Sequence, residues 1–435
     1  MNLRRRFLAQ LGFLPLAPFA WWPRTVRAAS PWLSFRPGVF EVTVTSALVW
    51  VCCDTDTIIR LQYTSADTWT DAQLSERVVL TKATDYTAVI PLTALRADTR
   101  YRFRVTDTDG TTRDAEFAGG SFRTAPDVDR NFAFVFSGDT HARHQPFTLF
   151  DQMAEKKPAF FIHLGDTVYA DSPRSQFRPA LDHYRFKHRE LRRDHHLQSF
   201  LATVPTFAIW DDHEVENDFI GSHPAIPVAR QAFREFWPNA DADGDVTILY
   251  RRFRWTPACE FFILDTRQYR DQGMYVEAAD RTMLGARQLA WLKAGLKESR
   301  ARFKFICSSV PFHQGGIDKW GGFKAERRGL VEFIRSERIR DVVILSADLH
   351  AAADLSDQRT GLTEFLVGPI AAPLQPVLAP NSRTLDTARP GSYVGDAYNF
   401  GSIRISHRDG QTVLRHEVID ANGFVRYTRE LMSIV

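Results

Sequence analysis

The chain has 435 residues, with 55 Lys and Arg, 52 Asp and Glu, and a formal net charge of +3. Hydrophobic residues make up 44% and charged residues 25%, which is typical of a folded globular protein and excludes a disordered or collagen-like chain. A net charge so close to zero gives no reason to expect nucleic-acid-specific binding or attachment to a membrane surface. At about 150 residues per domain, the length predicts two or three domains, or one small and one large.

The first thirty residues have the layout of an export signal. Three arginines at positions 4–6 precede an apolar run over residues 11–22, and small residues follow at Ala28 and Ala29. The run is shorter than the roughly 20 residues of a membrane span, so we expect no permanent membrane anchor. The order Arg4-Arg5-x-Phe7-Leu8 resembles the twin-arginine motif; a general secretory signal is the alternative. We therefore predict residues 1–29 to be a twin-arginine signal peptide, with the twin-arginine translocase as a partner during export and a periplasmic or secreted location.

The chain contains four cysteines, Cys52, Cys53, Cys259 and Cys307, which is few for an exported protein that relies on disulfides. Cys52, Cys53 and Cys307 lie in apolar, strand-like runs. We interpret them as buried thiols, with metal binding as a minor alternative. A protein that folds in the reducing cytoplasm before export needs no disulfides.

Residues 30–125 are predicted to form a small all-β domain. Short runs of β-branched and aromatic residues alternate there with turn residues, and no stretch has a helical period. The segment at residues 95–105 resembles the tyrosine corner of fibronectin type III domains, with Tyr101 as the tyrosine whose hydroxyl binds backbone upstream. We predict a fibronectin-III-like β-sandwich; a generic strand after a turn is the alternative.

From residue 126 the pattern changes to alternating strands and helices. Continuous apolar runs, typical of strands buried on both faces, occupy residues 132–136, 159–164, 206–210, 260–264, 303–307 and 342–345. Helices are predicted over residues 178–201, 283–298 and 324–336. Short strands are predicted for residues 401–429, with hairpin turns at Asp409-Gly410 and Asn422-Gly423. Residues 126–435 are therefore expected to form one α/β domain.

Carboxylates and imidazoles follow nearly every buried strand at once. They occupy five segments, at residues 139–141, 165–171, 211–218, 310–313 and 348–350. Ligands of open α/β sheets bind beyond the carboxyl ends of the strands, so these segments are expected to meet on one rim. Each alone has a plain alternative, such as an N-cap for the next helix. Together they offer more oxygen and nitrogen ligands than one ion needs, which predicts two adjacent metal ions.

In this order the motifs resemble those of the calcineurin-like metallophosphoesterases, and within them the PhoD-like alkaline phosphatases. The block at residues 210–215 and the block that holds Asp166, Tyr169 and Asp171 are the most specific to that branch. The resemblance covers essentially the whole chain. It implies a two-sheet α/β sandwich flanked by helices, which hydrolyses phosphate esters at a multinuclear metal site.

Matched motif by motif, the resemblance implies roles for the residues of the first metal position. Asp139 and His141 would bind the first metal, and His350 would complete its shell. Asp166 would bridge the two ions, and Tyr169 would supply a phenolate ligand.

The resemblance also implies roles at the second metal position and toward the substrate. Asn217 and Asp348 would bind the second metal, and His313 would be a further ligand. Asp212 stands where the wider superfamily has its ligand, so it remains the alternative to Asn217. His213 would lie beside the substrate as an acid or a phosphate donor.

Arg143 lies two residues after His141 and is a candidate contact for the phosphate. A solvated loop charge is an equally good interpretation of it.

The metal identity stays open. The better-known members of this branch have a Ser-Cys at the end of the first strand, whereas this chain has Gly138-Asp139-x-His141. That difference questions the iron-plus-calcium cofactor of the family and leaves Fe with Ca, or Zn or Mn. A Tyr169 phenolate favours ferric iron at one position.

We expect an exported, monomeric metal-dependent hydrolase of phosphate esters, in which hydroxide from a metal-bound water attacks phosphorus in line. His213 and Asp166 are its expected catalytic residues, and His213 would protonate the leaving group. Two alternatives are a phosphodiesterase for nucleotide, lipid or cell-wall polymer diesters, and a non-catalytic binding protein stabilised by metal. The sequence does not separate monoesters from diesters, because the ligand residues are the same.

Overall fold

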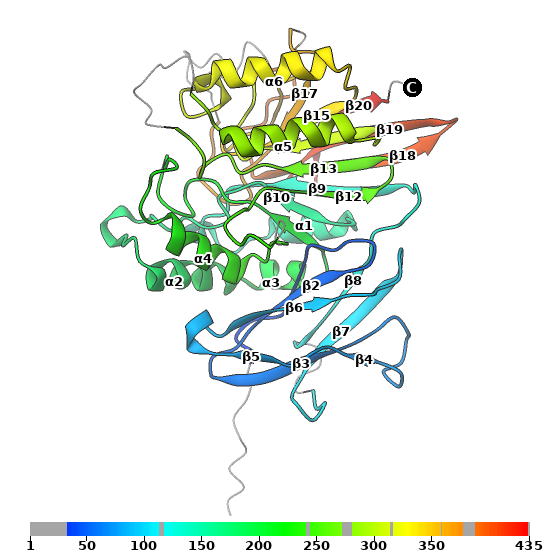
Figure 1. The fold of residues 1–435 in the computed structure, drawn as a ribbon, viewed down its shortest axis with the longest axis vertical. Helices are drawn as coiled ribbons and strands as arrows, with labels where there is room; N and C mark the ends of the chain where they lie inside the picture. The colour runs from blue at the N-terminus through cyan, green and yellow to red at the C-terminus, as the bar shows by residue number, and fades with distance from the viewer. Residues whose placement is uncertain are drawn as a thin grey trace, which may run out of the picture. The chain divides into compact units, whose positions relative to one another are not determined.

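The computed structural model describes residues 33–112, 117–240, 244–271, 281–313, 316–357, 359–376 and 388–433 (Figure 1). The predicted signal peptide at residues 1–29 lies outside these ranges. The remainder of the chain, from Trp32 onward, clusters as a single unit.

A nine-stranded sheet forms one layer of the fold. Its strands, in spatial order, are β20 (Val425–Met432), β19 (Gln411–Asp420), β18 (Asn399–Arg408), β9 (Phe132–Ser137), β10 (Phe161–His163), β11 (Thr206–Ala208), β1 (Gly38–Phe40), β2 (Ala47–Cys52) and β6 (Thr87–Leu92). The central strands β9, β10 and β11 are parallel, and all their residues are buried. Their carboxyl ends therefore open on the same edge of the sheet.

A six-stranded sheet forms the second layer. Its strands are β12 (Arg251–Thr256), β13 (Cys259–Ile263), β14 (Phe303–Cys307), β15 (Val342–Ser346), β17 (Thr363–Leu366) and β16 (Ala353–Asp354). Strands β13, β14, β15 and β17 are parallel. Phe134 of the first sheet packs edge-on against Phe261 and Phe305 of the second, with ring centroids 5.2 and 5.4 Å apart. The two sheets thus share an aromatic core between their inner faces.

The outer face of the second sheet is covered by helices. Phe262, Ile306 and Ile344 alternate with the inward-facing residues and pack against Leu292 and Leu330 in a separate hydrophobic cluster. Leu292 belongs to α5 (Gly285–Glu298) and Leu330 to α6 (Lys324–Ser336), which lie side by side over this sheet (Figure 1). The other helices are α1 (Leu149–Glu155), α2 (Leu181–Arg192), α3 (His195–Leu201) and α4 (Ile226–Phe236). α2 packs against α4, and α1 against α3.

The N-terminal β-region contributes to two sheets. Its strands β1, β2 and β6 continue the nine-stranded sheet, because Phe40 of β1 pairs in parallel with Thr206 of β11. The rest form a five-stranded sheet of β3 (Thr57–Thr64), β4 (Gln73–Leu74), β5 (Val78–Leu80), β7 (Arg100–Thr106) and β8 (Gly119–Arg123). The domain boundary near residue 125 stays a prediction. The structure adds that strands on either side of this boundary belong to one sheet.

The predicted tyrosine-corner contact is present. The backbone N–H of Arg96 donates to the hydroxyl of Tyr101 over 3.0 Å, five residues upstream in the chain. Tyr101 is buried and stacks on Phe122 of the adjacent strand, with ring centroids 5.7 Å apart. The hydroxyl therefore ties the turn before β7 to the strand itself.

Most predicted elements of the α/β region are present, with three differences. The helix predicted over 178–201 is broken at Asp194, whose carboxylate caps α3 by accepting the N–H of Leu197 over 3.0 Å. The predicted short C-terminal strands are ten residues long in β18 and β19. Helices α1 and α4 were not predicted. All four cysteines are buried free thiols, and no helix among the described residues has the length and apolarity to cross a membrane.

Candidate metal centre

Charged residues converge where the parallel strands of both sheets end. Asp139, Asp166 and Asp212 follow β9, β10 and β11, while Asp348 and His350 follow β15 of the other sheet. Potential ligand atoms from these residues form groups within 4.8 Å of one another. The centre therefore draws on both layers of the fold, and four of the five segments that were predicted to meet on one rim contribute to it.

The first group consists of Asp139, Asp166 and His350. Asp139 and Asp166 are buried, and Oδ1 of Asp139 lies 3.9 Å from Nε2 of His350. All three residues have left-handed backbone conformations, with φ of 65°, 51° and 53°. Such conformations cost about 1–3 kcal/mol each in non-glycine residues and cluster at functional sites. The fold therefore holds these ligands in place at a cost in backbone strain.

His350 presents one ring nitrogen to this group. Its Nδ1 lies 2.6 Å from the carbonyl oxygen of Pro373, which only accepts hydrogen bonds, so Nδ1 carries the proton. Nε2 is then left with its lone pair, and it accepts the hydroxyl of Tyr169 over 2.9 Å. An orienting carbonyl on the far nitrogen is the usual arrangement of a metal-binding imidazole. His350 and Tyr169 thus converge beside Asp139.

Asp212 is the centre of the second set of groups. It joins Asp166 and His213 in one group and Asp211 and Asp348 in another. In a third group it joins Asp218 and Asp318. Oδ1 of Asp212 accepts the N–H of His213 over 3.0 Å, and Oδ2 accepts the N–H of Asp218 over 2.8 Å. These bonds fix the Asp212 carboxylate in the middle of the loop that follows β11.

Glu214 fastens the loops after β10 and β11 to each other. One carboxylate oxygen accepts the N–H and the hydroxyl of Thr167, over 2.5 and 2.7 Å, and the other accepts the N–H of Asp211 over 2.9 Å. Gly165 lets the same loops approach closely, because an added Cβ would lie 2.7 Å from Cβ of Asp211. These contacts set the separation of Asp166 from Asp212.

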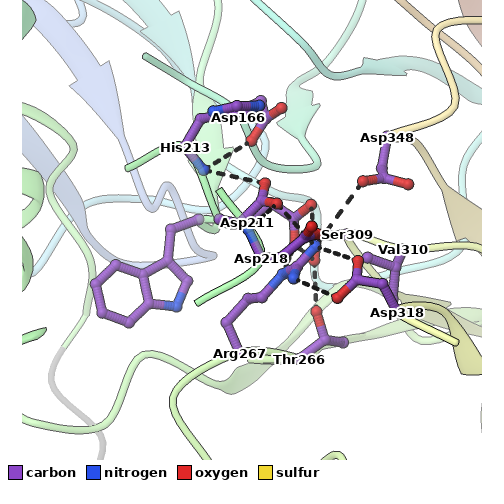
Figure 2. A network of polar contacts seen from close by, with 12 residues as sticks. Asp166, Asp211, His213, Asp218, Thr266, Arg267, Ser309, Val310, Asp318 and Asp348 are labelled. Carbon is purple, nitrogen blue, oxygen red and sulfur yellow. Dashed lines mark hydrogen bonds and ion pairs between the residues drawn. The ribbon is translucent and has the colours of Figure 1, made fainter. Parts of the chain in front are cut away.

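Two cationic side chains enter the second half of the centre. The buried guanidinium of Arg267 binds both oxygens of Asp211, over 2.6 and 3.1 Å, and both oxygens of Asp318, over 2.9 and 3.0 Å (Figure 2). It lies 3.9 Å from Asp348. The ammonium of Lys319 contacts the other oxygen of Asp348 and lies 3.1 Å from Asp318.

His213 is paired with Asp171 at the edge of the centre. Its Nδ1 lies 2.7 Å from Oδ1 of Asp171, and its ring stacks on Tyr169 with centroids 4.2 Å apart. Burial opposes the imidazolium charge, but Asp212 and the hydrogen-bonded Asp171 outweigh it and raise the pKa of His213 to about 9. His213 is therefore protonated at neutral pH and carries a proton on Nε2.

Four predicted site residues, His141, Arg143, Asn217 and His313, are engaged by other contacts or exposed. Nδ1 of His141 accepts the N–H of Arg143 over 3.0 Å, and its Nε2 lies 3.0 Å from the hydroxyl of Ser172. Arg143 itself is exposed. His141 stays next to the centre, because its ring packs on Tyr169 with centroids 4.6 Å apart.

His313 and Asn217 are also engaged elsewhere. Nδ1 of His313 lies 2.9 Å from a carboxylate oxygen of Glu364, and its Nε2 lies 2.9 Å from the hydroxyl of Thr360. Asn217 is exposed, and its amide donates to Asp218 over 2.8 Å. Of the two alternatives for the third motif, the geometry favours Asp212, which takes part in three of the groups.

The first group fits a metal ion. Oδ2 of Asp139 is buried without a hydrogen-bond partner among the described residues. Burial, followed by repulsion from neighbouring carboxylates, raises the pKa of both Asp139 and Asp166. A cation bound by these oxygens and by Nε2 of His350 would satisfy the unpartnered atom and relieve the repulsion.

Some site residues were not singled out from the sequence. Arg267 lies four residues after the end of β13, so its position close to the end of a buried strand was a signal that sequence reasoning could have used. Asp318 and Lys319 lie in the loop between β14 and α6, with no strand end before them. Asp211 belonged to a recognised motif but had no assigned role; the structure shows it as the partner of Arg267.

Comparison with known proteins agrees with this geometry. The family model of the PhoD-like phosphatases matches residues 132–415. Alkaline phosphatase D of Bacillus subtilis (strain 168) is 28% identical over 283 residues, which cover 54% of this chain and 48% of that protein. The chain therefore matches about half the length of this curated relative.

Two solved structures share the fold. A structure of PhoD superposes with a TM-score of 0.77 at 20% identity and covers 93% of this chain and 94% of its own. A purple acid phosphatase from yellow lupin (Lupinus luteus) seeds superposes with a TM-score of 0.62 at 12% identity, covering 91% of this chain and 73% of its own. The mixed α/β sheets thus share the fold of PhoD and of this purple acid phosphatase. With the family model covering more than half of its residues, the chain belongs to the PhoD-like phosphatase family.

Proposed function

We propose that this protein is a metal-dependent hydrolase of phosphate esters. The observation that carries the proposal is the buried group of Asp139, Asp166 and His350, in which one oxygen of Asp139 has no partner among the described residues. Family membership and the relative named alkaline phosphatase D support the same class of reaction. A metal ion bound there would polarise the phosphate and lower the pKa of a bound water.

The protein's own groups have distinct tasks in this proposal. Asp139, Asp166 and His350 hold the metal, and Tyr169 is the next ligand because its hydroxyl already lies on Nε2 of His350. Asp166 belongs to two ligand groups, which supports its predicted position between two cations. The carboxylates exclude a negatively charged substrate until a cation is bound, so we expect phosphate binding to depend on metal.

His213 is the proposed proton donor to the leaving group. The carboxylate of Asp171 holds Nδ1 and leaves Nε2 of the imidazolium to face outward from the pair. A protonated His213 next to Asp166, whose Oδ1 lies 3.3 Å from the His213 backbone nitrogen, is near the expected position of the phosphate. No other histidine among the described residues shares a ligand group with Asp166 and Asp212.

The test is turnover of chromogenic phosphate esters by the purified protein before and after chelation. We expect hydrolysis of p-nitrophenyl phosphate or its diester analogue to stop on removal of metal and to return on its addition. Turnover that survives complete chelation would contradict the proposal. The ratio of monoester to diester turnover decides between phosphatase and phosphodiesterase, and retention of metal without turnover would indicate a binding protein.

We also propose export through the twin-arginine route, with the mature chain beginning near Ala29. The motif Arg4-Arg5-x-Phe7-Leu8 supports it, as do four buried thiols without disulfides, which suit folding in a reducing compartment. Replacing Arg4 and Arg5 by lysine should leave the protein in the cytoplasm, as measured by cell fractionation. Unimpaired export of that variant would contradict the proposal.

The N-terminal region is proposed to be a fibronectin-III-like sandwich. The hydrogen bond from the N–H of Arg96 to Tyr101 supports this proposal. Replacing Tyr101 by Phe removes the hydroxyl only and should lower the free energy of unfolding by about 1 kcal/mol, as measured by denaturant unfolding.

A further inference from the structure

The two halves of the metal centre differ in how their carboxylates are neutralised. Among the described residues, neither Asp139 nor Asp166 forms an ion pair with a lysine or arginine; their contacts include His350 and the backbone of His213. In the other half, Asp211, Asp212 and Asp348 each face a cationic side chain. The second position is therefore already supplied with positive charge.

Lys319 and Arg267 supply that charge. The ammonium of Lys319 contacts Oδ2 of Asp348, which the sequence assigned to the second metal. The guanidinium of Arg267 lies 2.6 Å from Asp211, 3.4 Å from Asp212 and 3.9 Å from the other oxygen of Asp348. Figure 2 shows Arg267 between Asp318 and Asp211, and a dashed line joins its guanidinium to Asp348. A metal at this position would have to displace an ammonium or bind next to it.

Lys319 is held in place by the fold. Its ammonium also lies 3.1 Å from Asp318, which in turn binds Arg267 and Arg270. The next residue, Trp320, is fully buried, and its indole N–H donates to the hydroxyl of Ser308 over 3.1 Å. The Lys319 side chain is 15% exposed. These anchors distinguish it from a flexible surface lysine.

We propose that the ammonium of Lys319 takes the place of the second metal ion. The chain then binds one metal, through Asp139, Asp166 and His350, and presents Lys319 as a fixed second cation toward the phosphate. The inference rests on the proposed function for its first metal site. It replaces the two-metal arrangement expected from the sequence with one metal and one side-chain cation.

The experiment counts metal rather than turnover. The purified full chain is loaded with excess Mn²⁺ alone, passed over a desalting column, and analysed for metal per chain by mass spectrometry. We expect one equivalent for the unmodified protein and two for Lys319→Met, which keeps an unbranched side chain one atom shorter and removes the charge. Lys297→Met is the matched control. Lys297 lies on α5 and forms an exposed ion pair with Glu337, which follows α6, so this variant should stay at one equivalent.

Two results would overturn the inference: two equivalents in the unmodified protein, or one equivalent in a folded Lys319→Met variant. If Lys319→Met does not fold, Asp348→Asn answers the same question. It should retain the single equivalent, because Asp348 binds Lys319 rather than metal, and loss of that equivalent would contradict the proposal. A chain that binds no metal at all would instead contradict the proposed function.

Discussion

Nδ1 of His213 lies 2.7 Å from Oδ1 of Asp171, and the other oxygen of Asp171 accepts the N–H of Asn217 over 3.0 Å. The carboxylate therefore orients the imidazole and fastens the turn that follows it. A protonated histidine held in this way keeps one ring orientation and leaves its Nε2–H available to donate. The pair is separate from the ligands Asp139 and His350, so its role can be tested without removing metal.

Replacing His213 by Ala is expected to lower kcat by about 10²–10⁴-fold, the usual range for loss of a general acid, while metal content stays unchanged. Asp171→Asn keeps the imidazole but weakens its orientation, so the fall in kcat should be smaller. Turnover of p-nitrophenyl phosphate and metal analysis of the same samples measure both effects. Loss of metal in His213→Ala would show instead that the imidazole is a ligand.

Asp166→Asn keeps the shape of the side chain and removes its charge. Because Asp166 belongs to two of the four ligand groups, including the group that holds the proposed metal, we expect the variant to lose bound metal and phosphate-ester hydrolysis together. The five-stranded N-terminal sheet should remain folded, because none of the contacts given for Asp166 among the described residues involves that sheet. Elemental analysis and an activity assay of the same samples measure the outcome. Full metal content with normal turnover would contradict the role of Asp166 as a metal ligand.

Asp212 and Asn217 make a matched pair for the third motif. In the Lys319→Met background, which is expected to bind a second ion, Asp212→Asn should lower the metal content, because the Asp212 carboxylate lies in three ligand groups. Asn217→Ala in the same background should change the metal content little, because Asn217 is exposed and donates to Asp218. The opposite pattern in metal analysis would restore the ligand role that the resemblance assigns to Asn217.

The sequence predicted the strands well because buried parallel strands are apolar on both faces. Residues 303–307, for example, coincide with β14. It predicted one helix over 178–201 because the apolar period continues across the break. Asp194 ends that helix through two contacts, with Leu197 nearby and with Phe147 far away in the chain. The second contact depends on tertiary structure.

The strand ends located the metal centre, but the identities of its contacts needed the structure. Asp139, Asp166 and His350 meet as expected. His313 follows a strand in the same way, yet Glu364 from β17 takes its Nδ1. Lys319 comes from a loop without periodicity, and only the folded chain brings it to Asp348. The position of a motif thus predicts that its residues lie at the rim of the sheets. It does not predict which side-chain atoms contact each other there.

Gly165→Ala tests the close approach of the loops. Gly165 has φ of +112°, and an added Cβ would lie 2.7 Å from Cβ of Asp211 and 3.0 Å from Cβ of Ser309. We expect the free energy of unfolding to fall by about 1–3 kcal/mol, together with turnover, because Asp166 must shift. Gly361→Ala is the control: it has φ of +71° with no atom within 4 Å of the added Cβ, so it should lose some stability but keep turnover.

His416 should make the fold sensitive to acid. It is fully buried on β19 and stacked on Phe365 with ring centroids 3.9 Å apart. Burial, followed by the charge of Arg429, lowers the pKa of His416 to about 3. Between that value and the unfolded pKa of about 6.5, the unfolded chain binds one proton more than the folded chain. The contribution of His416 to the free energy of unfolding is therefore fully present above about pH 7. It falls as the pH drops and is lower by about 2 kcal/mol at pH 5. Urea unfolding at pH 7 and pH 5 measures this effect. Between these two pH values, the free energy of unfolding of His416→Leu should fall by about 2 kcal/mol less than that of the unmodified protein. An equal fall in both proteins would contradict the assignment.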